Sequence, residues 1–65
     1  MKRIVLVNGM IIVPAFSDEK IHCRRVEKYG IEWLSIESHC EIVGRGFIKP
    51  NEIIIPLNSI AMIFE

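Results

Sequence analysis

Residues 2–16 read KRIVLVNGMIIVPAF, and this stretch decides the fold. Two runs of β-branched and other apolar residues flank Asn8-Gly9. Asn-Gly between two such runs is the strongest short-range signal for a β-hairpin. We therefore predict strands at about 2–7 and 10–13. Pro14 lacks the N–H that a strand ladder needs, so the second strand is expected to end there or to lie at an edge.

Both predicted strands of this hairpin are apolar at successive positions. A strand with one face in water alternates apolar and polar residues, whereas a continuous apolar run is typical of a strand that is covered on both faces. The pattern therefore predicts that the hairpin is covered twice, either by the rest of a closed barrel or by a second subunit.

The composition supports a small folded domain. The chain has 65 residues, eight Lys plus Arg against eight Asp plus Glu, and thirteen isoleucines. Disordered chains are poor in β-branched residues and rich in net charge, so we predict one folded domain spanning 1–65. A domain of this size buries only roughly 60% of the surface that its unfolded chain exposes. The small core therefore predicts self-association, and we expect a homo-oligomer.

The segment 17–30 fits two structures. As a helix it has Ser17 at the N-cap and Gly30 just past the end, both in preferred positions. Its apolar residues form only a weak helical stripe. As a strand, Ile21 and Cys23 point to one face and the chain then turns into the next strand. We predict the strand and keep one short helix within 17–30 as the alternative.

Two further strands are expected in the middle of the chain. Residues 31–37 begin with alternating character and change phase at Trp33, which predicts a bulge or a strong bend. Residues 40–48 are expected to form one strand, with Gly44 and Gly46 allowing it to bend sharply.

The last part of the chain predicts a turn and two short strands. The turn is expected at 49–52, where proline and asparagine take their preferred turn positions. Strands follow at 52–57 and 60–65, separated by a break at Asn58-Ser59. Short strands at regular spacing with turn signals between them favour an all-β fold, namely a small SH3-like or Sm-like barrel of about five to six short strands.

The closing segment, NEIIIPLNSIAMIFE at 51–65, resembles the end of small SH3-like and Sm-like β-barrel proteins of bacteria and phages, where a strand, a one-turn break and a last strand complete the fold. Arg45-Gly46 is similar to the Arg-Gly of the second Sm motif. In that motif the last strand follows directly, whereas another turn and strand intervene here. The resemblance implies a barrel, and the Sm motif implies a role in RNA binding.

The histidines and cysteines occur as His22-Cys23 and His39-Cys40. Two His and two Cys could supply a tetrahedral zinc site, but neighbouring strand residues point to opposite faces, so we predict no metal site. A cross-strand disulfide between the two cysteines is the alternative to two buried thiols. With so few cysteines the chain lacks the disulfide framework of small secreted domains, and we expect a cytoplasmic protein.

No membrane segment and no catalytic motif is expected. The longest apolar runs are far shorter than the roughly 18 residues that a spanning helix requires. Ser38 and His39 are adjacent, so their side chains do not face each other as nucleophile and base must. Gly44-Arg45-Gly46 lacks the Lys-Ser/Thr and the following helix of a phosphate-binding loop. We therefore predict that the protein is not an enzyme and uses no cofactor.

The cations fall into two groups, each near aromatic residues. The first group is Arg24 and Arg25 with Tyr29 and Trp33, and the second is Arg45 and Lys49 with Phe47. Guanidinium groups hold phosphates and aromatic rings stack on bases, so these seven residues are the predicted ligand-binding site. The alternative is that the first two arginines pair with Asp18, Glu19 or Glu27 and that the tryptophan fills the core.

The charge balance narrows the ligand. A domain that binds long RNA or DNA is usually basic, whereas this chain is neutral with a pI near 6.7. We therefore predict a non-enzymatic, homo-oligomeric binding module for a nucleotide-like ligand or a short RNA. One example is a phage sponge that sequesters a cyclic nucleotide signal. The alternative hypothesis is a protein–protein interaction inhibitor or scaffold that acts on a host protein.

Overall fold

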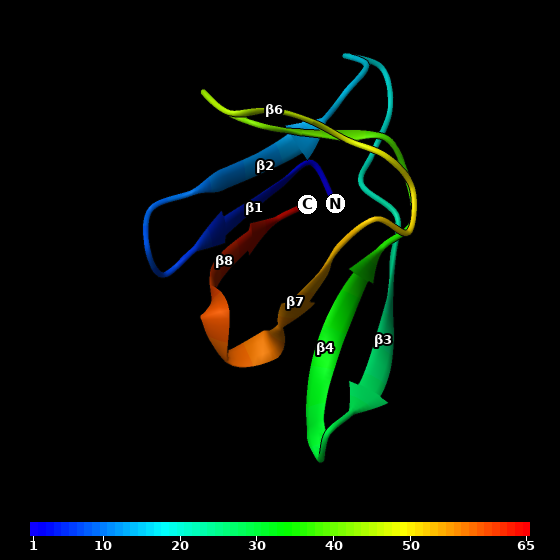
Figure 1. The fold of residues 1–65 in the computed structure, drawn as a ribbon. Helices are drawn as coiled ribbons and strands as arrows, with labels where there is room; N and C mark the ends of the chain where they lie inside the picture. Colours follow the sequence, from blue (N-terminus) through cyan, green and yellow to red (C-terminus); the bar gives the residue numbers. More distant parts are fainter.

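The computed structural model describes all residues from 1 to 65 and is all-β (Figure 1). The chain forms eight strands and one 3-10 turn. In chain order they are β1 (Arg3–Leu6), β2 (Ile11–Pro14), β3 (Cys23–Lys28), β4 (Ile31–Ile36), β5 (Cys40–Ile42), β6 (Gly46–Ile48), β7 (Ile54–Pro56), η1 (Leu57–Ser59) and β8 (Ile60–Phe64).

The strands form two antiparallel sheets, and neither closes into a barrel. The larger sheet has the order β6-β5-β2-β1-β8, and the smaller has the order β3-β4-β7. Pro56 ends β7, and the one-turn break that we predicted before the last strand is η1, which carries the chain into β8 of the other sheet. The all-β prediction is confirmed, and the chain has eight strands where we expected five or six.

The core lies between the two sheets and consists of few residues. Its eight buried hydrophobic residues are Ile4, Ile12, Ile21, Leu34, Ile36, Cys40, Ile48 and Ile55. They come from seven strands or loops that are distant in sequence. Most of the isoleucines outside this set are partly or fully exposed, which agrees with the low burial expected for so short a chain.

The first hairpin has the predicted place but a longer loop. Ile4 pairs with Ile12, and the backbone N–H of Leu6 donates to the carbonyl of Met10 at 2.8 Å. Three residues, 7–9, therefore form the loop, and Gly9 takes a φ of 91° in it. A two-residue Asn-Gly loop was expected. A three-residue loop with a left-handed glycine is the next common hairpin connection, and the same sequence suits it.

The segment 17–30 contains no helix, so the strand interpretation is confirmed for its second half. β3 pairs with β4 in continuous register from Cys23–Ile36 to Lys28–Ile31, and Ile21 is buried in the core. This continuous register also excludes the bulge predicted at Trp33. The alternation of apolar and polar residues stops at Trp33 because the second half of β4 is buried at successive positions.

The prediction of one bent strand at 40–48 is wrong. The chain forms two strands there, β5 and β6, joined by a tight three-residue loop. Ile42 pairs with Gly46, and the N–H of Arg45 donates to the carbonyl of Ile42 at 2.9 Å. Gly44 has a φ of 82°, a left-handed conformation that reverses the chain. The two glycines thus close a hairpin in place of bending a strand.

The β3–β4 turn stores strain that can be removed. Tyr29 and Gly30 are its two central residues, with φ of 56° and 77°, and such type I′ turns prefer Asn-Gly. A bulky residue in the left-handed region costs about 1 kcal/mol or more. We expect Tyr29→Asn to raise the free energy of unfolding by about 1 kcal/mol in urea titrations. The neighbouring change Lys28→Asn should not raise the free energy of unfolding. Equal stability of the two variants would show that Tyr29 is not strained.

Candidate functional site

The two arginines of the first predicted group are held in ion pairs on β3. Arg24 Nε lies 2.9 Å from Glu37 Oε2, and Arg25 pairs with Glu32. Because they are neighbours on one strand, the two arginines point to opposite faces of the sheet. Both arginines are therefore in ion pairs, as the alternative expected, but their partners are Glu37 and Glu32 and not the acids at 18, 19 or 27. Their opposite directions separate them from a shared ligand.

The aromatic residues of the first group have different surroundings. Trp33 is half-buried, and its Nε1–H donates to the backbone carbonyl of Lys28 at 3.0 Å. This bond fixes the indole against the β3–β4 hairpin. Tyr29 is 90% exposed at the tip of the same hairpin. The group therefore lies along one hairpin but does not converge on a pocket.

The second predicted group does converge. Phe47 lies in the edge strand β6, Lys49 follows directly after the strand on the same face, and Arg45 lies in the loop that precedes it. The ring of Phe47 is 75% exposed, and neither cation takes part in any ion pair of the chain. β6 lies in the larger sheet, whereas the β3–β4 hairpin of the first group projects away from it (Figure 1). The seven predicted residues therefore form two separate groups.

An apolar groove adjoins this second group. It has a volume of about 470 Å³ and lies between the loop after β2 and the β5–β6 hairpin. Its lining atoms are almost all apolar. The residues that line it are Ala15, Phe16, His39, Cys40, Phe47, Ile48, Lys49 and Pro50. Two of them are exposed phenyl rings, and none is a carboxylate, so the groove presents apolar surface with cationic groups at its rim.

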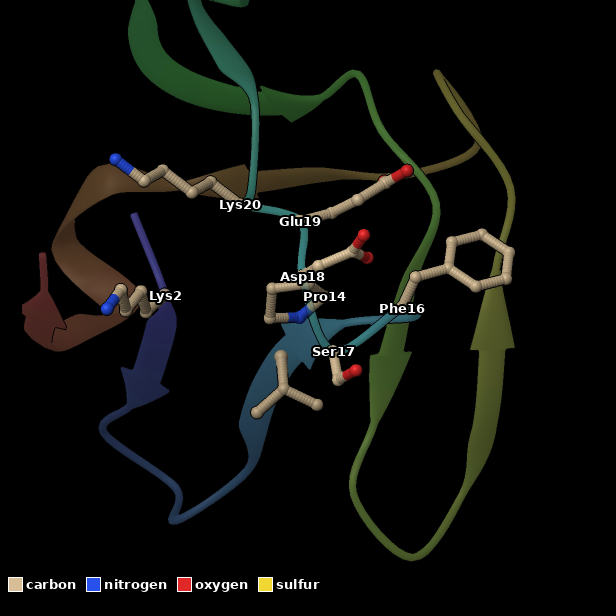
Figure 2. Close-up of a pocket in the computed structure, with 8 residues that line it drawn as sticks. Lys2, Pro14, Phe16, Ser17, Asp18, Glu19 and Lys20 are labelled. Carbon is tan, nitrogen blue, oxygen red and sulfur yellow. The ribbon is translucent and has the colours of Figure 1, made fainter.

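Phe16 separates this groove from a second, polar hollow. Figure 2 shows the Phe16 ring pointing from its loop toward the β5–β6 hairpin, while Lys2 and Lys20 lie on the other side. The polar hollow, of about 510 Å³, is lined by these two lysines together with Asp18 and Glu19. Its two positive and two negative charges balance, so it offers no preference for a ligand of one sign.

Two residues that line the groove, Phe16 and His39, were not among the predicted site residues. The Phe16 ring meets the His39 ring edge-on, with the centroids 6.3 Å apart and the planes at 63°. Phe16 is 55% exposed, although it follows an apolar strand. The only sequence feature that points to Phe16 as a binding residue is its position just after Pro14, where the predicted strand ends. Nothing in the sequence shows that a loop residue meets a hairpin more than twenty residues away.

The two cysteines are free thiols with separate partners. Cys23 Sγ lies 3.5 Å from Met1 Sδ, and Cys40 Sγ lies 3.7 Å from Ser38 Oγ. The disulfide alternative is therefore not formed. No cluster of three or more His, Cys, Asp or Glu residues is arranged to hold a metal ion. Burial raises the pKa of both thiols, which keeps them protonated and weakly reactive at neutral pH.

The raised pKa values predict a pH dependence of stability. An unfolded thiol has a pKa of about 8.5, and the folded values of Cys23 and Cys40 lie above it. As pH rises past about 8.5, the unfolded chain loses thiol protons first, so the free energy of unfolding falls. Urea titrations across this range should show the fall in the natural chain and a smaller one in the Cys23→Ala, Cys40→Ala double variant. If the free energy of unfolding falls equally with pH in the natural chain and in the double variant, the fall does not come from the two thiols.

Comparison with protein-family models, with curated protein sequences and with solved structures found no match to this chain. No helix in the structure has the length and apolar character that crossing a membrane requires. The function is therefore inferred from the groove and from the exposed surface around it.

Proposed function

We propose that this protein is a non-enzymatic interaction module that binds a partner protein by taking one large apolar side chain into the groove between Phe16 and Phe47. The observation that carries the proposal is the groove itself, about 470 Å³ of almost entirely apolar lining between two exposed phenyl rings. Central pockets that exclude water around an apolar anchor supply most of the binding free energy in protein–protein interfaces.

The apolar lining favours an amino-acid side chain over a nucleotide base. A base has polar edges, and burying them without hydrogen-bond partners costs free energy. The groove has almost no polar lining with which to satisfy them. Leucine, methionine or phenylalanine has no such edges, so its burial there carries no comparable penalty.

The charges at the rim define the flanks of the partner segment. Lys49 is the one charged side chain that lines the groove. Outside the lining, Arg45 precedes β6 and Glu41 lies opposite Phe47 on the neighbouring strand. A positively charged lining selects partners with acidic residues and repels basic ones. The partner is therefore a segment of a host protein that has an apolar anchor residue next to Asp or Glu. By binding this segment, the protein would act as an inhibitor or a scaffold.

A second candidate function is binding of a nucleotide-like ligand or a short RNA. It is favoured by one observation, the alternation of Arg45, Phe47 and Lys49 along β6. Residues two apart on a strand are about 7 Å apart, so a base stacked on the exposed phenyl ring would have a cation on each side for its phosphates. This arrangement uses the open face of the strand and leaves the groove empty.

A single set of binding experiments separates the two candidates. The immobilised protein is offered a displayed library of peptides, and in parallel a calorimetric panel of mononucleotides, cyclic nucleotides and short oligonucleotides. We expect enrichment of peptides that carry a large apolar residue beside acidic ones, and no heat from the nucleotides. Nucleotide binding that is lost in Arg45→Ala but kept in Phe16→Ala would instead support the second candidate. No binding in either assay would refute both.

A further inference from the structure

The outer face of the larger sheet carries a row of residues that is symmetric about its middle, except that the two charged positions have opposite signs. Pairing places Phe47 of β6 opposite Glu41 of β5, and Glu41 opposite Val13 of β2. In β1 and β2, Ile4 pairs with Ile12, and the same register places Arg3 opposite Val13. On its other side, Arg3 pairs with Phe64 of β8. Directly paired residues point to the same face. Across the five strands the row therefore contains an aromatic ring, an acid, a valine, a base and an aromatic ring.

The two charges in this row have no ion-pair partner within the chain. The three ion pairs join Met1 to Glu65, Arg24 to Glu37 and Arg25 to Glu32, and none involves Glu41 or Arg3. Two strand spacings, about 10 Å, separate the acid from the base, with Val13 between them. The Arg3 guanidinium instead lies over the Phe64 ring, 4.2 Å from its centroid. Both charges are therefore available to a molecule that covers this face.

Apolar residues surround the row. Met62, Val5 and Ile11 form a second row on the same face, and the N–H of Val43 donates to the Ile11 carbonyl beside them. Met62 and Val43 are each more than half exposed. The continuous apolar strands predict cover on this face; within the chain, the loop at 16–20 lies beside Val13, and Met62 and Val43 stay exposed. Exposed apolar areas of this kind mark interaction surfaces.

We propose that a second copy of this chain covers this face, in a two-fold dimer whose axis runs along β2. Such an axis reverses the order of the strands, so β6 lies over β8 of the other copy and β5 lies over its β1. Glu41 then lies over Arg3 of the second copy, Val13 over Val13, and Phe47 over Phe64. The reciprocal arrangement forms two equivalent ion pairs, because opposite charges lie at equal distances from the middle strand.

The geometry suits known packing of sheets. Facing sheets lie about 10 Å apart with their strands nearly aligned, a distance that a glutamate and an arginine span together. The β2 strand is the middle one of five, with β1 and β8 on one side (Figure 1), so the whole sheet overlaps its copy. A different protein would need aromatic rings and opposite charges at matching positions, whereas a second copy of this chain provides them by symmetry.

A charge exchange tests the dimer. Sedimentation equilibrium over micromolar concentrations should show twice the 7.5 kDa chain mass. Arg3→Glu and Glu41→Arg should each weaken the dimer at least about tenfold, because each places like charges together. The double variant, which carries both changes, should recover the dimer. Arg24→Glu, on the other sheet, is the matched control and should leave the mass unchanged.

Several outcomes would overturn the dimer. They are a monomeric natural chain, a dimer that tolerates both single reversals, a double variant that stays monomeric, or a dimer lost in the control. Amide NMR shifts of the natural chain on dilution give a second measurement that needs no variant: they should change in β1, β2 and β5 and stay constant in β3. Phe16→Ala should weaken peptide binding and leave the dimer intact, whereas Phe47→Ala should weaken both, because Phe47 borders the groove and also faces Phe64 of the second copy. The Phe16 variant therefore distinguishes failure of the groove proposal from failure of the dimer.

Discussion

Replacing Ile36 with alanine will remove most of the free energy of unfolding. The side chain is completely buried at the end of β4, and its backbone also anchors the loop before β7, with the N–H donating to the carbonyl of Ile53 and the carbonyl accepting from the N–H of Asn51. Truncating a fully buried isoleucine to alanine costs about 3 kcal/mol or more, since the lost burial and the remaining cavity add. A core of this size supplies only about 3–5 kcal/mol of net stability.

The measurement is a urea titration followed by circular dichroism, with thermal unfolding as a second probe. Ile31→Ala is the matched control, because Ile31 lies on the same strand and is 46% exposed. We expect the control to lose less than about 1 kcal/mol. A well-folded Ile36→Ala variant with an unchanged midpoint would mean that the core is organised around other residues.

The largest effect on binding is expected from the two phenyl rings of the groove. Phe47→Ala should weaken the selected acid-flanked peptide about thirtyfold, because truncating an anchoring contact in a water-excluding pocket costs about 2 kcal/mol. Phe16→Ala should act similarly, since its ring forms the opposite wall. Because both rings contact the same anchor residue, the losses in the double variant should not add fully.

Fluorescence titrations with a labelled peptide measure these losses, and unfolding curves show that each variant is folded. Both rings are exposed by more than half, so their truncation should change stability little. Tyr29→Ala is the control, because it removes an even more exposed aromatic ring from the distant β3–β4 hairpin. Equal binding by all three variants would exclude the groove as the docking site.

The positions of the turns were predictable from the sequence, but the structures of two of them were not. Asn8-Gly9 correctly placed the first hairpin, and Gly30 correctly ended the β3–β4 turn, because glycine alone takes left-handed conformations freely. Gly44 and Gly46 were interpreted as a bend. A glycine permits both a bend and a reversal, and the pairing of Ile42 with Gly46, together with β2 on the other side of β5, selects the reversal.

Only part of the candidate site was predictable, because local sequence determines which neighbours share a face but not which distant segments pack together. Arg45, Phe47 and Lys49 alternate in sequence, and a strand places alternate residues on one face, so local geometry already groups them. Phe16 comes from a loop near the other end of the chain. Its place beside the β5–β6 hairpin depends on long-range packing of β2 against β5, which no local pattern in the sequence reports.

The amino-acid sequence by itself determined that this chain is all-β and where its first hairpin lies, and it predicts cover on both faces of the N-terminal strands. These follow from local conformational preference and from the period of side chains along a strand. The order of the strands, the open edges of the two sheets, the ion pairs of Arg24 and Arg25, and the alignment of Glu41, Val13 and Arg3 arose only in the folded molecule. They depend on which strands pair and in which register, and that choice is made by the burial of a small core assembled from the whole chain.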